Sequence, residues 1–194
     1  MTTNDAAAAF LVEALRTFRG YKARTERALA QLRPEDWFRL IDPEANSIAI
    51  IIKHMAGNMR SRWTDFLTSD GEKPNRARDT EFEIDDADTV PQLKARWDEG
   101  WKLVFDALTP LSEKDLTRVV TIRGQPHTVL QAVMRQLTHY AYHVGQIVFL
   151  GRQMVGKQWK SLSIPRGKSK DVDVARDGSV VRAPAQPAPT KGKR

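Results

Sequence analysis

Four long segments of this sequence repeat their apolar side chains at steps of three and four residues, the spacing that gathers them on one face of an α-helix. The segments cover residues 5–32, 46–67, 89–108 and 128–155. Helices of that length carry enough apolar surface to bury one another. The pattern therefore predicts an all-α fold built as a four-helix bundle.

Side chains that cap helices mark where three of these segments begin. Asn46 is expected to cap the second helix, because its side-chain oxygen can accept a hydrogen bond from a free backbone N–H of the first turn. Thr89 and Thr128 are each followed three residues later by a glutamine, which is the pattern of a capping box. We therefore expect the third and fourth helices to begin at these threonines.

Two of the connections between the helices carry a prediction of their own. Residues 118–122 alternate enough for a short strand and residues 123–126 are typical of a turn, so a hairpin-like segment is expected before the fourth helix. Residues 69–88 form a polar, acidic connection of about twenty residues. Loops of that length are usually functional or wrapped against the body of the protein, so we expect this one near the mouth of a site.

The formal net charge of +7 belongs to the end of the chain. Residues 157–194 contain ten Lys or Arg and three Asp, whereas the preceding part is balanced. We expect the bundle to occupy residues 1–156, followed by a basic C-terminal extension that is disordered from about residue 169, because polar sequence without periodicity cannot bury a core. Nucleic-acid binding by this extension is not favoured, since Trp159 is its only aromatic residue.

The sequence also indicates the cellular compartment of the protein and the types of side chain that could bind a metal. No window reaches the roughly 18 consecutive apolar residues that a membrane span needs. The first twenty residues mix acids and arginines where a signal peptide would be basic and then apolar, so a cytoplasmic protein is expected. There is no cysteine, which excludes disulfides and thiolate metal sites. Any metal must therefore be bound through nitrogen and oxygen.

Three of the four histidines fall within predicted helices, at the border of the apolar face. His139 and His143 are four residues apart, a rise of about 6 Å with a rotation of about 40° beyond one turn, so both rings can reach one ion. His54 lies in the second helix beside a strongly apolar stripe. Buried polar groups need partners, and the pattern alone leaves two interpretations open, a shared metal ion or three structural histidines.

A site of three neutral imidazoles would leave at least one coordination position open for water or substrate, as in catalytic metal sites. Zinc, nickel or iron would each suit such a set of ligands. The fourth histidine, His127, precedes the fourth helix and is interpreted as a surface or capping residue.

Three motifs resemble the DinB and YfiT-like superfamily of metal-dependent four-helix bundles, over residues 8–156. They are IAIIIKHMAGNM in the second helix, RGQPHTVLQAV before the fourth, and HYAYHVGQIVFLGR within the fourth. The segment WKSLSIPRGKS is similar to the tail of one uncharacterised subgroup. The resemblance implies a homodimeric bundle in which His54, His139 and His143 hold one divalent metal ion.

Characterised members of this superfamily include thiol-dependent S-transferases and a thiol-dependent isomerase, in which the metal activates a low-molecular-weight thiol. The resemblance thus implies a metal-dependent enzyme, such as a thiol S-transferase or a related transferase or hydrolase, acting on a small-molecule substrate. Gln146, Asn58 and Tyr140 are candidates for groups that support the ligands, although each is also explained by packing. The alternative is a non-catalytic, metal-stabilised binding protein whose basic tail contacts a partner or nucleic acid. The sequence identifies no catalytic residue beyond the metal ligands.

Overall fold

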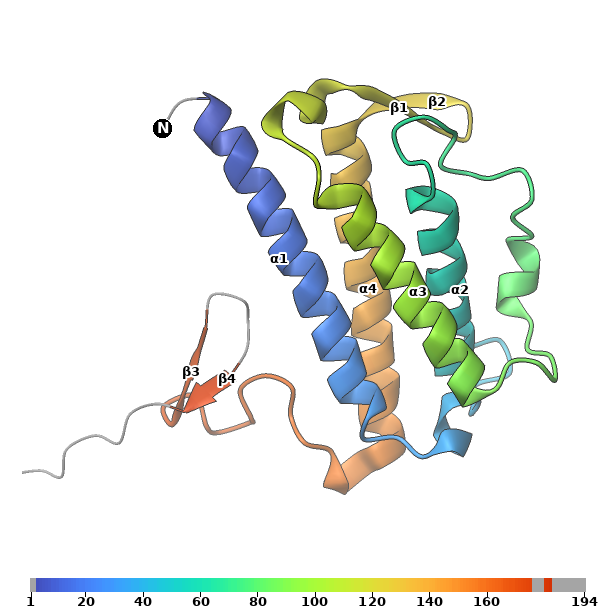
Figure 1. The fold of residues 1–194 in the computed structure, drawn as a ribbon. Helices are drawn as coiled ribbons and strands as arrows, with labels where there is room; N and C mark the ends of the chain where they lie inside the picture. The colour runs from blue at the N-terminus through green and yellow to red at the C-terminus, as the bar shows by residue number, and fades with distance from the viewer. Residues whose placement is uncertain (1–2, 176–179, 183–194) are drawn as a thin grey trace, which may run out of the picture. The chain divides into compact units, whose positions relative to one another are not determined.

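The computed structural model describes residues 3–175 and 180–182 and is mostly helical (Figure 1). Four long helices form a bundle in which α2 packs along α3, α1 packs along α4, and the pairs meet through α2–α4 and α1–α3 contacts. The predicted helical bundle is confirmed at this level. The helices are α1 (Thr3–Leu29), α2 (Ile48–Trp63), α3 (Val90–Leu108) and α4 (Val129–Val155).

One cluster of aromatic rings joins all four helices. Phe18 of α1 lies 6.2 Å from Trp63 of α2, 6.1 Å from Trp101 of α3 and 5.7 Å from Tyr140 of α4, measured between ring centroids. All four side chains are buried. Such pairs contribute about 0.5–1.5 kcal/mol each beyond the burial of their area, so this cluster fixes the helices against one another.

The ends of α2 differ from the prediction. The N-cap is Ser47 and not Asn46, because the buried Ser47 Oγ accepts the hydrogen bond from the Ile50 N–H at 3.2 Å. The helix ends at Trp63 instead of near residue 67, since Thr64 adopts an extended conformation and Asp65 a positive φ of 48°. The predicted starts of α3 and α4 are confirmed, with Thr89 and Thr128 as N-caps.

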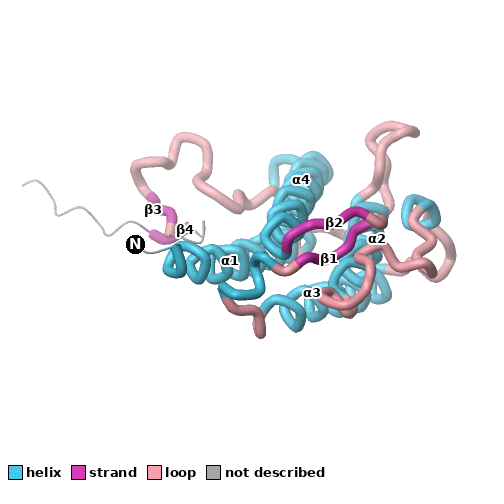
Figure 2. Tube along the Cα trace, turned by 90° about the horizontal axis from the view of Figure 1, so that it is seen from above, coloured by secondary structure: helices cyan, strands magenta, loops and turns pink. Residues whose placement is uncertain are grey.

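A two-stranded hairpin leads into α4 and lies over one end of the bundle (Figure 2). Strand β1 (Val119–Ile122) pairs antiparallel with β2 (Gln125–Thr128). The hairpin turns at two residues, Arg123 and Gly124, with φ of 54° and 71°, the positive values that a type I′ turn requires. The turn is shorter than the predicted residues 123–126 because Gln125 and Pro126 already belong to β2.

The connection of residues 64–89 folds back against α2 and contains one short helical turn, η2 (Asp79–Phe82). Its first part is tied to the hairpin, because the Asp70 carboxylate accepts hydrogen bonds from the N–H groups of Arg123 and Gly124 at 2.9 and 2.8 Å. Its last part is tied to α2 by an ion pair of 2.5 Å between Asp88 and Lys53. The loop is therefore held along the face of α2 that carries His54.

The chain divides into two units, Met1–Trp159 and Lys160–Arg194. In the second unit, β3 (Val172–Val174) pairs antiparallel with β4 (Val180–Arg182), two strands that the sequence pattern did not predict. Residues 176–179 and 183–194, on which much of the expected disorder falls, lie outside the described residues. Within the part of the chain that is described, no helix has both the length and the apolar character needed to cross a membrane.

Candidate metal centre

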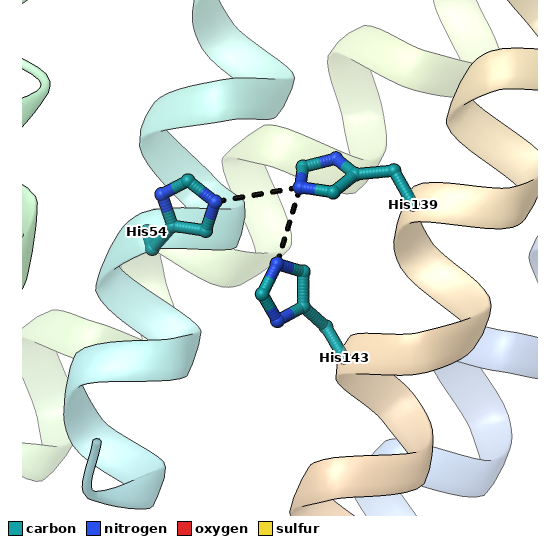
Figure 3. Close-up of side chains that lie close together, drawn as sticks. All are labelled: His54, His139 and His143. Atoms are coloured by element: carbon teal, nitrogen blue, oxygen red, sulfur yellow. Dashed lines mark hydrogen bonds between the residues drawn. The ribbon is translucent and has the colours of Figure 1, made fainter. Parts of the chain in front are cut away.

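The three predicted histidines converge between α2 and α4 (Figure 3). His54 Nε2 lies 3.4 Å from His139 Nε2, and His143 Nε2 lies 3.1 Å from the same atom. The nitrogen atoms that the three rings offer all lie within 4.8 Å of one another. His54 and His143 are buried and His139 is half-buried, so the cluster borders the core as the periodicity predicts.

Each ring is held from its other nitrogen by an oxygen atom. His54 Nδ1 lies 2.8 Å from Glu81 Oε2, His143 Nδ1 lies 2.8 Å from Gln146 Oε1, and His139 Nδ1 lies 3.3 Å from Gln136 Oε1. With these oxygens as acceptors, the tautomer that satisfies all three contacts is the one with the proton on Nδ1. In that tautomer each Nε2 keeps its lone pair, and the Nε2 atoms of His54 and His143 both lie beside that of His139.

The charge state of the rings suits metal binding. Burial lowers the pKa of His139 to about 3, with further lowering by His143 and His54. Burial also lowers the pKa of His143 to about 4. Both rings are therefore neutral at physiological pH, which is the form that binds a metal ion.

The donor set fits a first-row divalent cation. Three lone pairs without a proton between them repel one another, and a shared cation would remove that repulsion. Nitrogens placed about 2.0–2.1 Å from a tetrahedral ion are roughly 3.3 Å apart, close to the two separations of 3.1 and 3.4 Å seen here. Imidazole nitrogen suits zinc, nickel and iron alike.

The carboxylate that orients His54 is not itself marked by any pattern in the sequence. Glu81, on η2, is buried and receives two hydrogen bonds from the Arg76 guanidinium, at 2.8 and 2.7 Å. Burial raises the pKa of Glu81, but the hydrogen bonds from His54 and Arg76 outweigh it and leave the pKa below its usual range. Carboxylate–histidine pairs of this kind orient the ring and strengthen it as a ligand.

One residue of α2 shows why Glu81 can reach the centre. A Cβ atom on Gly57 would lie 2.2 Å from Glu81 Oε1 and 2.7 Å from its Cδ, so any other side chain at this position would displace the carboxylate. Gly57 stands three residues after His54, in the motif HMAG. A glycine within a strongly apolar helix was the sequence signal for this close approach.

Of the remaining candidate residues, one forms a hydrogen bond with a histidine of the cluster and the others do not. Gln146 supports His143, as described above. Tyr140 instead donates to Asn58 Oδ1 at 3.2 Å and accepts from Trp63 Nε1 at 2.9 Å, a buried chain that does not touch the Nδ1 atoms. His127 is not part of the cluster; its Nδ1 lies 3.0 Å from the carbonyl oxygen of Gln125 in the hairpin.

A cavity of about 500 Å³ opens beside the cluster, with His54 and His139 in its wall. A ligand in this cavity would therefore have access to two of the three histidines. The expectation that residues 69–88 lie near a site mouth is met, because Glu72, Arg76 and Arg78 also line this cavity.

Residues 5–168 match the model of a protein family described as "Protein of unknown function (DUF1572)". The match includes the bundle, the three histidines and Glu81. No match was found among curated proteins.

Proposed function

Since the chain belongs to this family of proteins of unknown function, we propose that it is a metal-dependent enzyme of the DinB/YfiT-like type, with His54, His139 and His143 as the ligands of one divalent ion. The observation that carries this proposal is the orientation of the rings. The three Nε2 atoms lie together while every Nδ1 is held by an oxygen acceptor. The contacts between the rings at 3.4 and 3.1 Å can be hydrogen bonds only if an Nε2 carries the proton, whereas the oxygen beside each Nδ1 favours the proton there.

The chemistry proposed is thiol-dependent group transfer on a small molecule. When bound, a divalent cation at three imidazoles favours the thiolate of a coordinated thiol, or the hydroxide of a coordinated water, as the nucleophile. Glu81 accepts the hydrogen bond from His54 Nδ1, which orients the ring with Nε2 toward the centre and increases its electron donation to a metal. Gln136 and Gln146 fix the other two rings in the same tautomer.

The metal site is tested by elemental analysis of the purified full chain beside a His139→Ala, His143→Ala double variant. About one equivalent of zinc, nickel or iron is expected in the parent and almost none in the double variant. A His127→Ala variant, which changes the histidine outside the cluster, should keep the metal. Absence of metal from all three after reconstitution with each ion would refute the site.

Turnover is tested separately, with the metal-loaded chain, a panel of low-molecular-weight thiols and electrophilic acceptors. Loss of the free thiol that depends on both the metal and the acceptor would support the transferase. Stoichiometric metal without turnover of any thiol or hydrolysable substrate would favour the alternative of a metal-stabilised binding protein.

A further inference from the structure

The cavity beside the metal centre is strongly cationic. Among the residues that the structure describes, five arginines line it, together with a single carboxylate, Glu72. We call this space the arginine cavity; its arginines are Arg62, Arg76, Arg78, Arg123 and Arg135. They come from α2, from the connection that follows it, from the hairpin turn and from α4.

The single carboxylate is shared among three guanidinium groups. Glu72 Oε2 lies 3.2 Å from Arg76 Nη1, 3.4 Å from Arg123 Nε and 3.7 Å from Arg62 Nη2. Arg76 is further neutralised by Glu81, so its charge is matched within the protein. The positive charge of Arg62 and Arg123 is only partly compensated.

Arg62 carries a buried positive charge in the wall of the arginine cavity. Its side chain is buried, with 3% of the residue exposed, and its Nε and Nη1 atoms have no hydrogen-bond partner in the described structure. Burial lowers the pKa of its guanidinium, and Arg135 and Arg76 lower it further, against the opposing effects of Tyr140 and Glu72. Buried arginine is almost always paired, because an uncompensated buried charge is strongly destabilising.

The position of Arg62 relates it to the metal centre. His54, Asn58 and Arg62 follow one another at four-residue steps on α2, and all three line the arginine cavity. Eight residues of helix rise about 12 Å, so the backbone positions of His54 and Arg62 lie about two turns apart along the wall of the cavity. Arg135 of α4 also lines the cavity and is exposed, with no ion pair to any residue that the structure describes.

We propose that the arginine cavity binds an oxyanion group of the substrate, a carboxylate or a phosphate, through Arg62, Arg123 and Arg135, while the reacting end of the same molecule lies at His54 and His139. This rests on the proposed function for the position of the reacting end. Guanidinium groups suit this role because their planar donors match carboxylate and phosphate oxygens two at a time. The substrate class is therefore a small anionic molecule, and neutral analogues of the same size are excluded.

The test is calorimetric titration of the metal-free full chain with inorganic phosphate and, separately, with succinate and its neutral diamide. Saturable binding of phosphate or succinate, weakened by salt, is expected, and none of the diamide. Preference for phosphate or for succinate distinguishes the two oxyanions. The variants Arg135→Gln and Arg62→Met should each bind about tenfold more weakly or worse.

Arg60→Gln is the matched control, because Arg60 lies on the same helix as Arg62 but pairs with Glu99 outside the arginine cavity. It should bind like the parent. Arg135 is exposed, so its variant keeps the test valid if Arg62→Met fails to fold. No binding by the parent, or equal weakening by all three substitutions, would overturn the proposal.

Repeating the succinate titration with the zinc-loaded chain separates this proposal from the metal site. Binding to metal-free protein that depends on Arg62 and Arg135 supports the arginine cavity even if elemental analysis refutes the metal. Binding that appears only with zinc and ignores both substitutions assigns the anion to the metal and overturns the arginine cavity alone.

Discussion

At the scale of single residues, Glu81 is the group whose removal should weaken the metal centre without touching a ligand. In Glu81→Gln the amide oxygen can still accept from His54 Nδ1, but the negative charge is lost and Arg76 loses a partner. Loss of such a supporting carboxylate typically lowers metal affinity by about 10–100-fold. We expect a loss in that range, measured by competition with a chromogenic zinc chelator.

Glu83→Gln is the control for this measurement, because Glu83 lies two residues further along the same connection with an exposed side chain. It should bind zinc like the parent protein. Equal affinity in the parent and Glu81→Gln would show that the carboxylate does not tune His54.

Gly57→Ala tests the same contact between Glu81 and α2 by changing the residue on α2 and leaving Glu81 in place. Alanine favours a helix by about 1 kcal/mol over glycine, yet its Cβ would lie 2.2 Å from Glu81 Oε1. We therefore expect weaker zinc binding with the helical circular dichroism retained. Gly145→Ala is the matched control on α4, since nothing lies within 4 Å of a Cβ there, and its zinc affinity should not change. Unchanged zinc affinity in Gly57→Ala would contradict the proposed role of this glycine.

The residues of the centre differ in how far the sequence could predict them. His139 and His143 share one helix, so their spacing alone fixes the relation of their rings. His54 could be added because an apolar stripe placed it at the border of the core. Glu81 could not, since it reaches His54 through an irregular connection whose path depends on ion pairs to α2 and α3. The burial of Arg62 could not be predicted either, because nothing in the pattern of α2 marks this arginine as buried.

At the scale of elements, the anchor of the connection between α2 and α3 is Asp88. Its carboxylate is fully buried and contacts Lys53 at 2.5 Å and Arg96 at 2.6 Å. These bonds from Lys53 and Arg96, with that from the Asp85 N–H, outweigh the effect of burial and leave the pKa of Asp88 below its usual range. Arg96 is partly exposed and Lys53 keeps its contact with Asp85, so Asp88→Ala should cost about 1.5–3 kcal/mol, the range for a hydrogen bond to a charged group.

Two measurements check this prediction. Urea unfolding gives the loss of stability, and hydrogen exchange should show faster exchange over residues 69–88 than over the helices. Asp86→Ala, an exposed neighbour in the same connection, should resemble the parent in both. Faster exchange spread evenly over all four helices would contradict a local anchoring role.

The helices themselves were largely predictable, and the errors have local causes. The end of α2 was placed too late because Phe66 continues the apolar spacing. Phe66 is indeed buried and packs 4.8 Å from Trp63, but it reaches the core from a turn after the positive φ of Asp65. Periodicity reports which side chains are buried and cannot by itself distinguish a helix from a turn that buries the same side chain.

At the scale of the whole molecule, the two depressed histidine pKa values predict how the stability of the metal-free protein depends on pH. His139 and His143 have pKa values of about 3 and about 4 in the folded chain, against 6.5 for an ordinary histidine. The unfolded chain therefore binds more protons below pH 6.5, so stability falls as the pH drops from 6.5 and this loss levels off near pH 3. The expected loss is on the order of a few kcal/mol.

Urea unfolding of metal-free protein at a series of pH values would measure this dependence. Carboxylates contribute over the same range, so the comparison is with a His139→Gln, His143→Gln double variant, which should lose less stability on acidification. Parallel curves for the two proteins would show that the histidines are not responsible.

The last prediction concerns assembly, where the superfamily resemblance implies a homodimer. Met134, Tyr142 and Phe149 lie on one face of α4 with exposed fractions of 46%, 53% and 62%. A row of large apolar side chains on one helix is typical of an interaction surface, and a twofold axis would let the same row meet itself in a second copy. We expect dimers in sedimentation velocity, and a shift to monomers in a Met134→Glu, Phe149→Glu variant because the carboxylates would be buried against apolar side chains. Val12→Glu, at an exposed apolar position on α1, should leave the dimer intact, and a monomeric parent protein would refute this use of α4.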